Sequence, residues 1–333
     1  MSQIVPSMFP ATRMRRNRQA DWVRRLTRET VLTKSDLVWA MIVHDGDEPR
    51  IPVDAMPGVD RLNLDEAVKA AKTARDLGIP ALALFPHIDP GRKDDMGSEA
   101  LNPEGFVPSV IRAIKAEVPE IGVMCDVALD PFTTHGHDGV MNDRNQIDND
   151  ATLEQLVQQS LIQAAAGVDV IAPSDMMDGR IGAIRLALEN SGFKDTMIMS
   201  YSAKYASCFY GPYREAVGSG AVLTGDKKTY QMDYGNTDEA LRETGLDISE
   251  GADMVMVKPG LPYLDIVQRV SSTFNVPTIV FQISGEYAQI KLAAQAGWLD
   301  EDKAIIETLS AFKRAGADGV VTYFAARAAE LLG

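Results

Sequence analysis

Two lysines at the ends of apolar segments are the residues whose type and position in this sequence favour chemistry. Lys258 ends the run MVMVK at 254–258, and Lys204 follows the apolar run at 197–202. Burying an ammonium group is costly, so a lysine at such a position has either a partner or a lowered pKa. Two ammonium groups that lie close together lower each other's pKa, and an unprotonated amine is a nucleophile for a carbonyl compound. The alternative is that each lysine extends to solvent from the rim of the fold.

A second group of polar residues lies in residues 126–139, which contain Asp130, His135, His137 and Asp138. Histidines and carboxylates at this density could bind a metal ion. They could equally act as acids and bases, hold an ammonium group, or make the hydrogen bonds of a tight loop. The sequence leaves these possibilities open.

Two further segments carry charges that an ion or a substrate could use. Residues 175–180 could bind a cation or simply begin a helix. Residues 208–228 contain glycines together with Arg214 and Lys227. That composition is typical of a mobile lid over a carboxylate-bearing substrate, or of a solvated loop.

Apolar segments that read as strands recur along the chain and would position these residues. They are residues 37–43, 81–85, 122–128, 168–173, 197–202, 254–258, 278–283 and 319–324. Most are apolar throughout, which is typical of parallel strands buried on both faces. Helical patterns lie between them at 64–77, 152–166, 181–190, 239–250, 263–274 and 303–315. The alternation predicts an α/β fold of the TIM (β/α)₈ barrel type; the alternative is a doubly wound sheet, although no GxGxxG follows the first strand.

The connections predict which end of the barrel is functional. Short turns with a glycine precede several strands, at Gly78, Gly167, Gly251 and Gly316, and such a glycine would end the preceding helix in a left-handed conformation. The segments that follow strands are long, at 86–103, 129–150 and 203–236. Long connections at one end indicate an active site at the carboxyl ends of the strands. The polar residues expected there are His87, Asp126, Asp130, Ser174, Asp175, Lys204, Lys258, Ser284 and Tyr323.

Composition and charge limit the class of protein. The chain has 333 residues, 45% of them hydrophobic, and two cysteines, too few for a disulfide framework. No run approaches a membrane span and no signal peptide is visible, so we expect a cytoplasmic protein without membrane contact. The net charge is −14, but residues 1–34 carry +6 and the remainder −20. We expect residues 1–34 to be an arm that contacts an acidic neighbouring subunit, and residues 35–333 to be the barrel. A solvated tail is the alternative, and nucleic-acid binding is disfavoured by the acidic body.

Several strings in this sequence resemble the 5-aminolevulinate dehydratase, or porphobilinogen synthase, family. They are DVALDPFTTHGHDG at 126–139, APSDMMDGRIGAIR at 172–185, SAKYASCFYGPYR at 202–214, KKTYQMD at 227–233, GADMVMVKPGLPYLDI at 251–266 and SGEYA at 284–288. The resemblance extends from about Arg13 to the C-terminus and implies a (β/α)₈ barrel whose arm wraps a partner in a homo-octamer. It implies a lyase that condenses two 5-aminolevulinates to porphobilinogen with loss of two waters, an early step of tetrapyrrole and haem biosynthesis.

The resemblance also implies roles for individual residues. Lys258 and Lys204 would form or support Schiff bases with the first and the second 5-aminolevulinate. The implied substrate-binding side chains are Arg214 and Lys227 on one carboxylate, Ser284 and Tyr323 on the other, Asp130 and Asp138 on an ammonium group, and Ser174 and Tyr213 in the pocket.

Departures from the family concern the metal and one hydroxyl. Zinc-type members have cysteines where this chain has Ala128, Asp130 and Asp138, so no zinc is expected. The resemblance implies an allosteric, non-catalytic Mg²⁺ at Glu243, with Asp169 helping to hold the hydrated ion. Position 281 is Phe where a tyrosine near the substrate is expected.

Three other functions are weighed against this one. A class I aldolase for phosphorylated sugars needs a phosphate-binding turn after the last two strands, which SGEYA and TYFAAR do not offer. A metal-dependent hydrolase would use His135, His137 and Asp138. A non-catalytic assembly protein would account for the arm but not for two lysines at strand ends.

Overall fold

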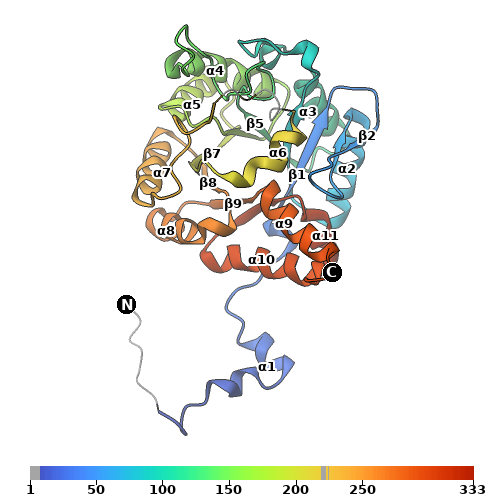
Figure 1. Cartoon of the computed structure of the whole chain (residues 1–333), viewed down its shortest axis with the longest axis vertical. Helices are drawn as coiled ribbons and strands as arrows, with labels where there is room; N and C mark the ends of the chain where they lie inside the picture. The colour runs from blue at the N-terminus through green and yellow to red at the C-terminus, as the bar shows by residue number, and fades with distance from the viewer. Residues whose placement is uncertain (1–7, 219–222, 224) are drawn as a thin grey trace.

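Parallel strands close into an eight-stranded barrel within residues 8–218, 223 and 225–333, which this computed structural model describes (Figure 1). The strands pair in chain order, and β10 also pairs with β1. They are β1 Leu37–His44, β4 Ala81–His87, β5 Gly122–Val127, β6 Val170–Pro173, β7 Met197–Lys204, β8 Met254–Lys258, β9 Thr278–Gln282 and β10 Gly319–Thr322. The predicted TIM barrel is confirmed. The doubly wound sheet is wrong, because β1 and β10 would not pair with each other in an open sheet.

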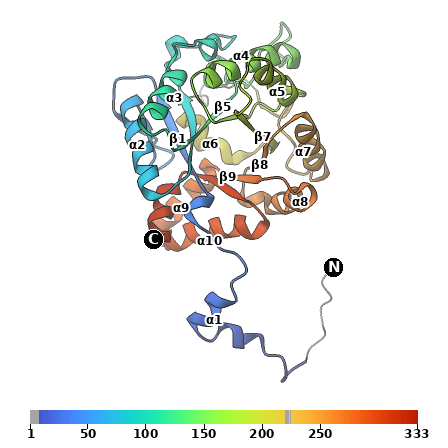
Figure 2. The same cartoon turned by 180° about the vertical axis from the view of Figure 1, so that it is seen from behind.

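Helices cover the outside of the barrel (Figures 1 and 2). They are α2 Leu64–Leu77, α3 Phe106–Glu117, α4 Asn149–Ala165, α5 Arg180–Asn190, α7 Asp238–Glu250, α8 Leu264–Phe274, α10 Glu301–Ala315 and α11 Ala325–Leu332. Two more helices, α6 Gly211–Ala216 and α9 Ser284–Gln295, are inserted after β7 and β9 in the described part of the chain. Ser284, directly after the predicted strand 278–283, therefore begins a helix. Tyr323 follows the end of β10, whereas the sequence predicted it within a strand.

Smaller elements complete the fold. Two of them, β2 Arg50–Pro52 and β3 Asp60–Leu62, form an antiparallel hairpin whose second strand pairs with β1. This hairpin is not predicted from the sequence. The short 3₁₀ helices are η1 Met14–Arg18, η2 Lys34–Asp36, η3 Pro90–Arg92, η4 Ser98–Leu101, η5 Cys208–Tyr210 and η6 Leu261–Tyr263.

The turns that lead into alternate strands have the conformation that the sequence predicts. Gly78, Gly251 and Gly316 end α2, α7 and α10 with φ of 80°, 107° and 108°. These values lie in the left-handed region, where a side chain would be strained. The predicted role of glycine in these turns is therefore confirmed.

An aspartate in the Gly-x-Asp turns joins neighbouring strands at their amino ends. Asp169 donates its N–H to the carbonyl of Val123 (3.0 Å), and its carboxylate accepts the N–H of Val123 (2.8 Å). The same reciprocal pair joins Asp253 to Ile198 (2.9 and 2.7 Å) and Asp318 to Thr278 (2.8 and 2.8 Å). We call this arrangement an aspartate clip. It extends the ladder by one charge-assisted hydrogen bond before each strand begins.

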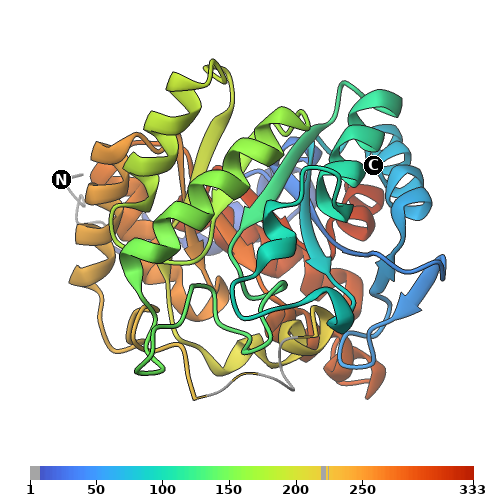
Figure 3. The ribbon, with the colours of Figure 1, turned by 90° about the horizontal axis from the view of Figure 1, so that it is seen from above.

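The long connections gather at the carboxyl ends of the strands, as predicted. In Figure 3 the segments that follow β4, β5 and β7 lie at the same end of the barrel, at the bottom of the view. Among the residues that the structure describes, no helix is long and apolar enough to cross a membrane.

The N-terminal segment projects from the barrel in Figures 1 and 2. Its helix α1 Asp21–Leu26 and η1 bury none of their side chains, and Trp22 and Leu26 are 63% and 76% exposed. The barrel begins at η2, where Asp36 forms an ion pair with Lys313 of α10 (2.9 Å). The segment thus leaves apolar side chains uncovered within a single chain.

Candidate active site

Lys204 and Lys258 lie side by side at the carboxyl ends of β7 and β8. They are paired positions in the parallel ladder, which is irregular between Ser200 and Ala203. Both side chains are buried and line one pocket. The lining residues are Asp130, Asp138, Ser174, Lys204, Tyr210, Tyr213, Arg214, Lys227, Gln231 and Lys258.

Aromatic rings surround the amine of Lys258. The ring centroids that lie 4.8–5.9 Å from Nζ belong to Phe281, Tyr201, Tyr213, Tyr210 and Phe85. Within the described residues, no oxygen lies at hydrogen-bonding or ion-pair distance from this Nζ. Burial, followed by the charge of Lys204, lowers the pKa of Lys258 to about 7. A large fraction of this amine is therefore unprotonated at neutral pH, as a nucleophile requires.

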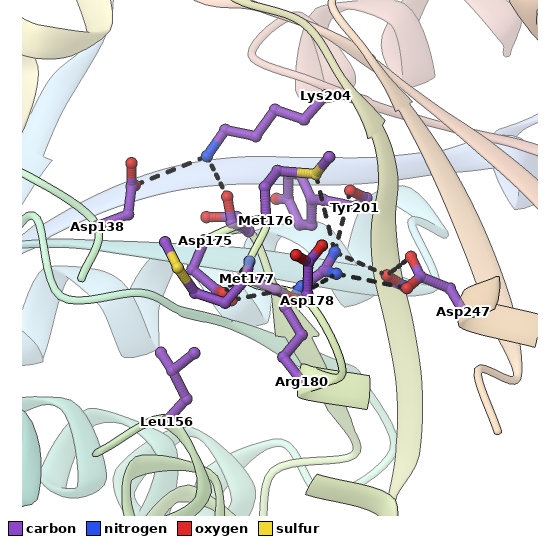
Figure 4. A network of polar contacts seen from close by, with 12 residues as sticks. Asp138, Leu156, Asp175, Met176, Met177, Asp178, Arg180, Tyr201, Lys204 and Asp247 are labelled. Carbon is purple, nitrogen blue, oxygen red and sulfur yellow. Dashed lines mark hydrogen bonds and ion pairs between the residues drawn. The ribbon is translucent and has the colours of Figure 1, made fainter. Parts of the chain in front are cut away.

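Lys204 has polar surroundings instead. Its Nζ donates to the carbonyl of Ser174 and lies 3.7 Å from a carboxylate oxygen of Asp138 (Figure 4). Adjacent strands therefore present an amine among aromatic rings and an amine among oxygens.

Lys227 lies between two buried carboxylates that follow β5. Its Nζ is 3.0 Å from Asp138 and 3.3 Å from Asp130. Burial raises the pKa of Asp130 although Lys227 opposes the shift. Burial also acts to raise the pKa of Asp138, but Lys204 and Lys227 together hold it below its usual range. One ammonium group thus lies between two carboxylates and offsets part of their charge.

The histidines of this loop do not converge on a common point. Nε2 of His135 lies 3.2 Å from the carbonyl of Asp95, and Nδ1 of His137 lies 3.0 Å from the hydroxyl of Tyr230. The described residues contain no group of three His, Cys, Asp or Glu side chains arranged to hold a metal ion. The hydrolase alternative therefore has no support in this geometry.

Asp126 is a buried carboxylate close to both lysines. Burial raises its pKa to about 6, although Lys258 and Lys204 lower it. Its Oδ1 has no hydrogen-bond partner among the described residues. A carboxyl group that titrates near neutral pH beside two amines can accept or donate a proton there.

The start of the predicted lid packs on the N-terminus of α9. The hydroxyl of Ser284 accepts the N–H of Tyr213 (2.9 Å) and donates to the carbonyl of Phe209 (3.4 Å). Arg214 follows Tyr213 and lines the pocket, and the buried hydroxyl of Tyr323 has no hydrogen-bond partner among the described residues. Residues 219–222 and 224 of the predicted lid lie outside the described residues.

Residues 175–180 bind an internal cation and also begin a helix. The guanidinium of Arg180, the first residue of α5, lies 3.5 Å from Asp175 and 3.4 Å from Asp247 of α7 (Figure 4). Asp247 also accepts the hydroxyl of Ser200 on β7 (2.6 Å). This buried network joins α7 to the strand that carries Lys204.

Glu243 does not line the lysine pocket but lines a second, wider groove. Burial, followed by the charge of Asp247, raises the pKa of Glu243, and Asp178 and Glu239 add to the shift. Within residues 8–218, 223 and 225–333, no cation lies at ion-pair distance from it. A half-buried carboxylate in an acidic, open groove fits a hydrated Mg²⁺, which keeps most of its water ligands.

Asp169, which was predicted to help hold the ion at Glu243, precedes β6 and is not among the residues that line the groove of Glu243. Its carboxylate forms an aspartate clip and an ion pair with Lys115 (2.9 Å), at the amino end of β6. Glu243 lines its groove together with Asp178, which follows the carboxyl end of β6. The acidic neighbours that matter for Glu243 are therefore Asp178, Glu239 and Asp247.

Sequence reasoning missed the aromatic surroundings of Lys258 and the role of Gln231 in the pocket wall. Tyr201 and Phe281 lie in strands that are apolar throughout, so no alternation distinguishes inward from outward residues. The ring centroid of Phe281 lies 4.8 Å from Nζ of Lys258.

Comparisons with known proteins agree with this geometry. A family model described as delta-aminolevulinic acid dehydratase matches residues 11–331. A protein of that name from Bradyrhizobium diazoefficiens is 61% identical over 327 residues, covering 98% of this chain and 92% of the relative. Another from Rhodobacter capsulatus is 51% identical and covers 100% of both chains. The crystal structure of porphobilinogen synthase from Toxoplasma gondii with its product porphobilinogen has a TM-score of 0.94 and 46% identity, covering 96% of this chain and 91% of that one.

Proposed function

Since this chain belongs to the delta-aminolevulinic acid dehydratase family and joins two molecules of 5-aminolevulinate into porphobilinogen, we propose that Lys258 and Lys204 each bind one of them as a Schiff base. The reaction is a lyase step of tetrapyrrole biosynthesis. The observation that carries the proposal is the pairing of the two lysines across β7 and β8 at the floor of one pocket.

Lys258 starts the covalent chemistry in this proposal. Its unprotonated amine adds to the ketone carbon of one 5-aminolevulinate, and the carbinolamine loses water to give an imine. The lowered pKa of Lys258 supports this role, because a protonated amine has no electron pair to donate. The nearby carboxyl group of Asp126, with a pKa near 6, can pass the protons that addition and water loss require.

Lys204 holds the second 5-aminolevulinate in the same way. The substrates are then joined by one C–C and one C–N bond, both lysine amines are released, and two waters leave in total. Binding both molecules in one pocket turns a bimolecular reaction into one between bound neighbours. Bringing the two molecules together accounts for a large part of the barrier in solution. Asp130 and Asp138 accept hydrogen bonds from the free ammonium group of a substrate, next to Lys227.

The carboxylates of the substrates are held by opposite walls of the pocket. Arg214 and Lys227 take one carboxylate, and Ser284 and Tyr323 take the other, with Ser174 and Tyr213 as further contacts. The unpartnered hydroxyl of Tyr323 supports this assignment, because a buried hydroxyl without a partner is costly until a ligand supplies one. Ser284 would exchange its contact with Tyr213 or Phe209 for the substrate.

Mg²⁺ at Glu243 completes the proposal as an allosteric, non-catalytic ion. When bound, it would supply positive charge to an acidic groove that lies outside the lysine pocket. The contacts from Asp247 through Arg180 to Ser200 and Asp175 give a physical connection from α7 to the strand of Lys204. Zinc has no place in the proposal, because Ala128, Asp130 and Asp138 offer no thiolate and both carboxylates are paired with Lys227.

Assembly and location are further parts of the proposal. The arm of residues 1–34 contacts a second copy of the chain, and the assembly is a homo-octamer. The exposed apolar side chains on the arm and its basic charge, opposite to that of the barrel, support this. We propose a cytoplasmic protein without nucleic-acid or membrane partners.

Borohydride reduction in the presence of 5-aminolevulinate tests the proposed function. Reduction converts each imine into a stable secondary amine, so peptide mass mapping identifies the modified lysines. Labels on the peptides of Lys258 and Lys204 are the expected result. A catalytically active protein that carries no label on either lysine would overturn the Schiff-base proposal.

A further inference from the structure

Glu286 is a buried carboxylate that the proposed function does not use. It is the third residue of α9, and it is 1% exposed. Its Oε2 accepts the N–H of Ile283 (2.9 Å) and of Gly260 (3.1 Å), and its Oε1 accepts the N–H of Leu261 (2.5 Å). In the part of the chain that the structure describes, no cation forms an ion pair with it. Backbone groups and the N-terminus of α9 stabilise its charge.

These hydrogen bonds begin where the strand ladder ends. The pairing of β8 with β9 runs from Val255–Thr278 to Val257–Val280 and stops one residue before Lys258. On the other side, the carbonyl of Lys258 accepts the N–H of Tyr205 (3.0 Å). Beyond the ladder, the side chain of Glu286 connects the residues after Lys258 to the end of β9. The backbone on both sides of Lys258 is thus tied to its neighbours.

The same helix N-terminus holds the start of the lid. Ser284, two residues before Glu286, bonds to Tyr213 and to Phe209. A side chain at Gly285 would collide with the carbonyl of Phe209, so the two backbones approach as closely as a glycine allows. The hydroxyl of Tyr210 donates to the carbonyl of Lys258 (3.4 Å). Glu286 therefore sits where the end of β8, α9 and the lid segment meet.

We propose that Glu286 is a positioning residue that fixes the backbone after Lys258 against α9 and so directs the Lys258 amine toward the substrate carbonyl. The proposal rests on the proposed function of Lys258 as the imine-forming amine. Glu286 does not line the pocket and acts through the backbone of Gly260 and Leu261. An error of about 1 Å in the position of a reacting group can cost a hundredfold in rate.

The experiment measures borohydride trapping of 5-aminolevulinate at the Lys258 peptide in the full chain, as a function of substrate concentration. The variants are Glu286→Gln and, as a matched carboxylate-to-amide control, Asp318→Asn. Asp318 forms an aspartate clip at the amino end of β9, so its loss weakens the same strand far from Lys258. Trapping is measured at about pH 8.5, where Lys258 is largely unprotonated and Glu286, whose pKa burial raises to about 7, is ionised.

We expect Glu286→Gln to lower the limiting rate of trapping by about ten- to a hundredfold with little change in half-saturating substrate. Asp318→Asn should lower the unfolding temperature but keep the limiting rate. If the glutamine variant does not fold, Glu286→Asp replaces it; the shorter side chain keeps the charge and the contact to Ile283 but withdraws from Gly260 and Leu261.

The outcomes separate the two proposals. If the wild-type chain carries no label at Lys258, the proposed function is wrong. If the wild type is labelled and the Glu286 variants reach the same limiting rate, the positioning role is wrong while the proposed function stands. Equal losses in the Glu286 variants and in Asp318→Asn, or failure of both Glu286 variants to fold, would make the residue structural and overturn the inference.

Discussion

Lys204 stands opposite Lys258 because β7 carries one residue more than β8 between their paired positions. Ser200 pairs with Val255 and Ala203 with Val257, so three steps along β7 match two along β8. In a regular ladder Ala203 would pair with Lys258, and successive side chains of a strand point to opposite faces. Lys204 would then face away from Lys258. The extra residue brings both amines to one pocket.

Replacement of Lys258 tests the first covalent step. Lys258→Ala should lower turnover by about a thousandfold or more and remove borohydride labelling of that peptide, because no other amine of the described residues lies among these rings. Lys204→Ala should also lose porphobilinogen formation but keep a label at Lys258. Lys303→Ala, at an exposed ion pair on α10, serves as the control. Turnover close to wild type in Lys258→Ala would refute the assignment.

The pH dependence of labelling follows from the pKa of Lys258. Below its pKa of about 7 the amine is protonated, so the trapping rate should fall about tenfold per pH unit and reach a plateau above about pH 8. Lys204→Met removes a neighbouring positive charge, which raises the pKa of Lys258 and moves the acid limb to higher pH. Trapping rates of the wild type and of Lys204→Met, measured from about pH 5.5 to 9, test this shift of the acid limb. An acid limb that stays in place or moves down in Lys204→Met contradicts the proposed coupling.

The loss of Lys227 should destabilise the folded chain as well as the substrate complex. Lys227→Met leaves Asp130 buried without an ammonium partner and Asp138 with Lys204 alone, at a cost of about 3–5 kcal/mol. Without Lys227, burial raises the pKa of Asp130 further above its usual value, so the loss should shrink as pH falls and Asp130 becomes protonated. Urea unfolding at about pH 8 and about pH 5 measures this.

Two variants control the Lys227 measurement. Lys228→Met changes the neighbouring exposed lysine and should leave stability within about 0.5 kcal/mol. Asp130→Asn added to Lys227→Met should recover part of the loss, because the buried carboxylate that lost its ion pair is gone. A Lys227→Met chain as stable as Lys228→Met at both pH values would show that the buried pair does not depend on Lys227.

Metal dependence should come from Mg²⁺ rather than zinc. Activity should survive a zinc-selective chelator and rise with added Mg²⁺, because the pocket offers no thiolate and Glu243 lies in an open acidic groove. Glu243→Ala should lose that rise while keeping the basal activity of the metal-free protein. Stoichiometric zinc in the active protein, with activity lost on its removal, would contradict the assignment. A Mg²⁺ response that persists in Glu243→Ala would place the ion elsewhere.

Removal of the arm should change assembly. A chain that begins at Thr33 keeps the contacts of η2 and the ion pair of Asp36 with Lys313, so the barrel itself should fold. We expect smaller particles by analytical ultracentrifugation and reduced activity. The double variant Trp22→Ala, Leu26→Ala keeps the arm's charge and should weaken assembly if its apolar side chains supply the contact. An unchanged particle size in the truncated chain would refute the role of the arm.

The barrel was readable in the sequence because its strands are apolar throughout and its turns carry glycine. The lysines were equally visible, since a charge at the end of an apolar run has few structural explanations. Other features depend on the register and on contacts distant in sequence. The extra residue in β7 does not change the hydrophobic pattern of the sequence. The residues around Lys227 in the sequence do not show that it lies between Asp130 and Asp138. Asp169 resembled a metal ligand only as an isolated acid; its pairing with Val123 requires the fold.

The aspartate clips allow closure of the barrel to occur in separate steps. The carboxylates of Asp169, Asp253 and Asp318 bond to residues only 46, 55 and 40 positions earlier, each within one strand–helix–strand unit. The entropic cost of closing a loop grows only slowly with loop length. Each unit can therefore form its clip before the N- and C-terminal strands pair. The contact of longest range in the barrel, between β10 and β1, then joins units that are already formed. Although β1 and β10 are far apart in the sequence, the contact order of the barrel is set mainly by contacts between consecutive strands.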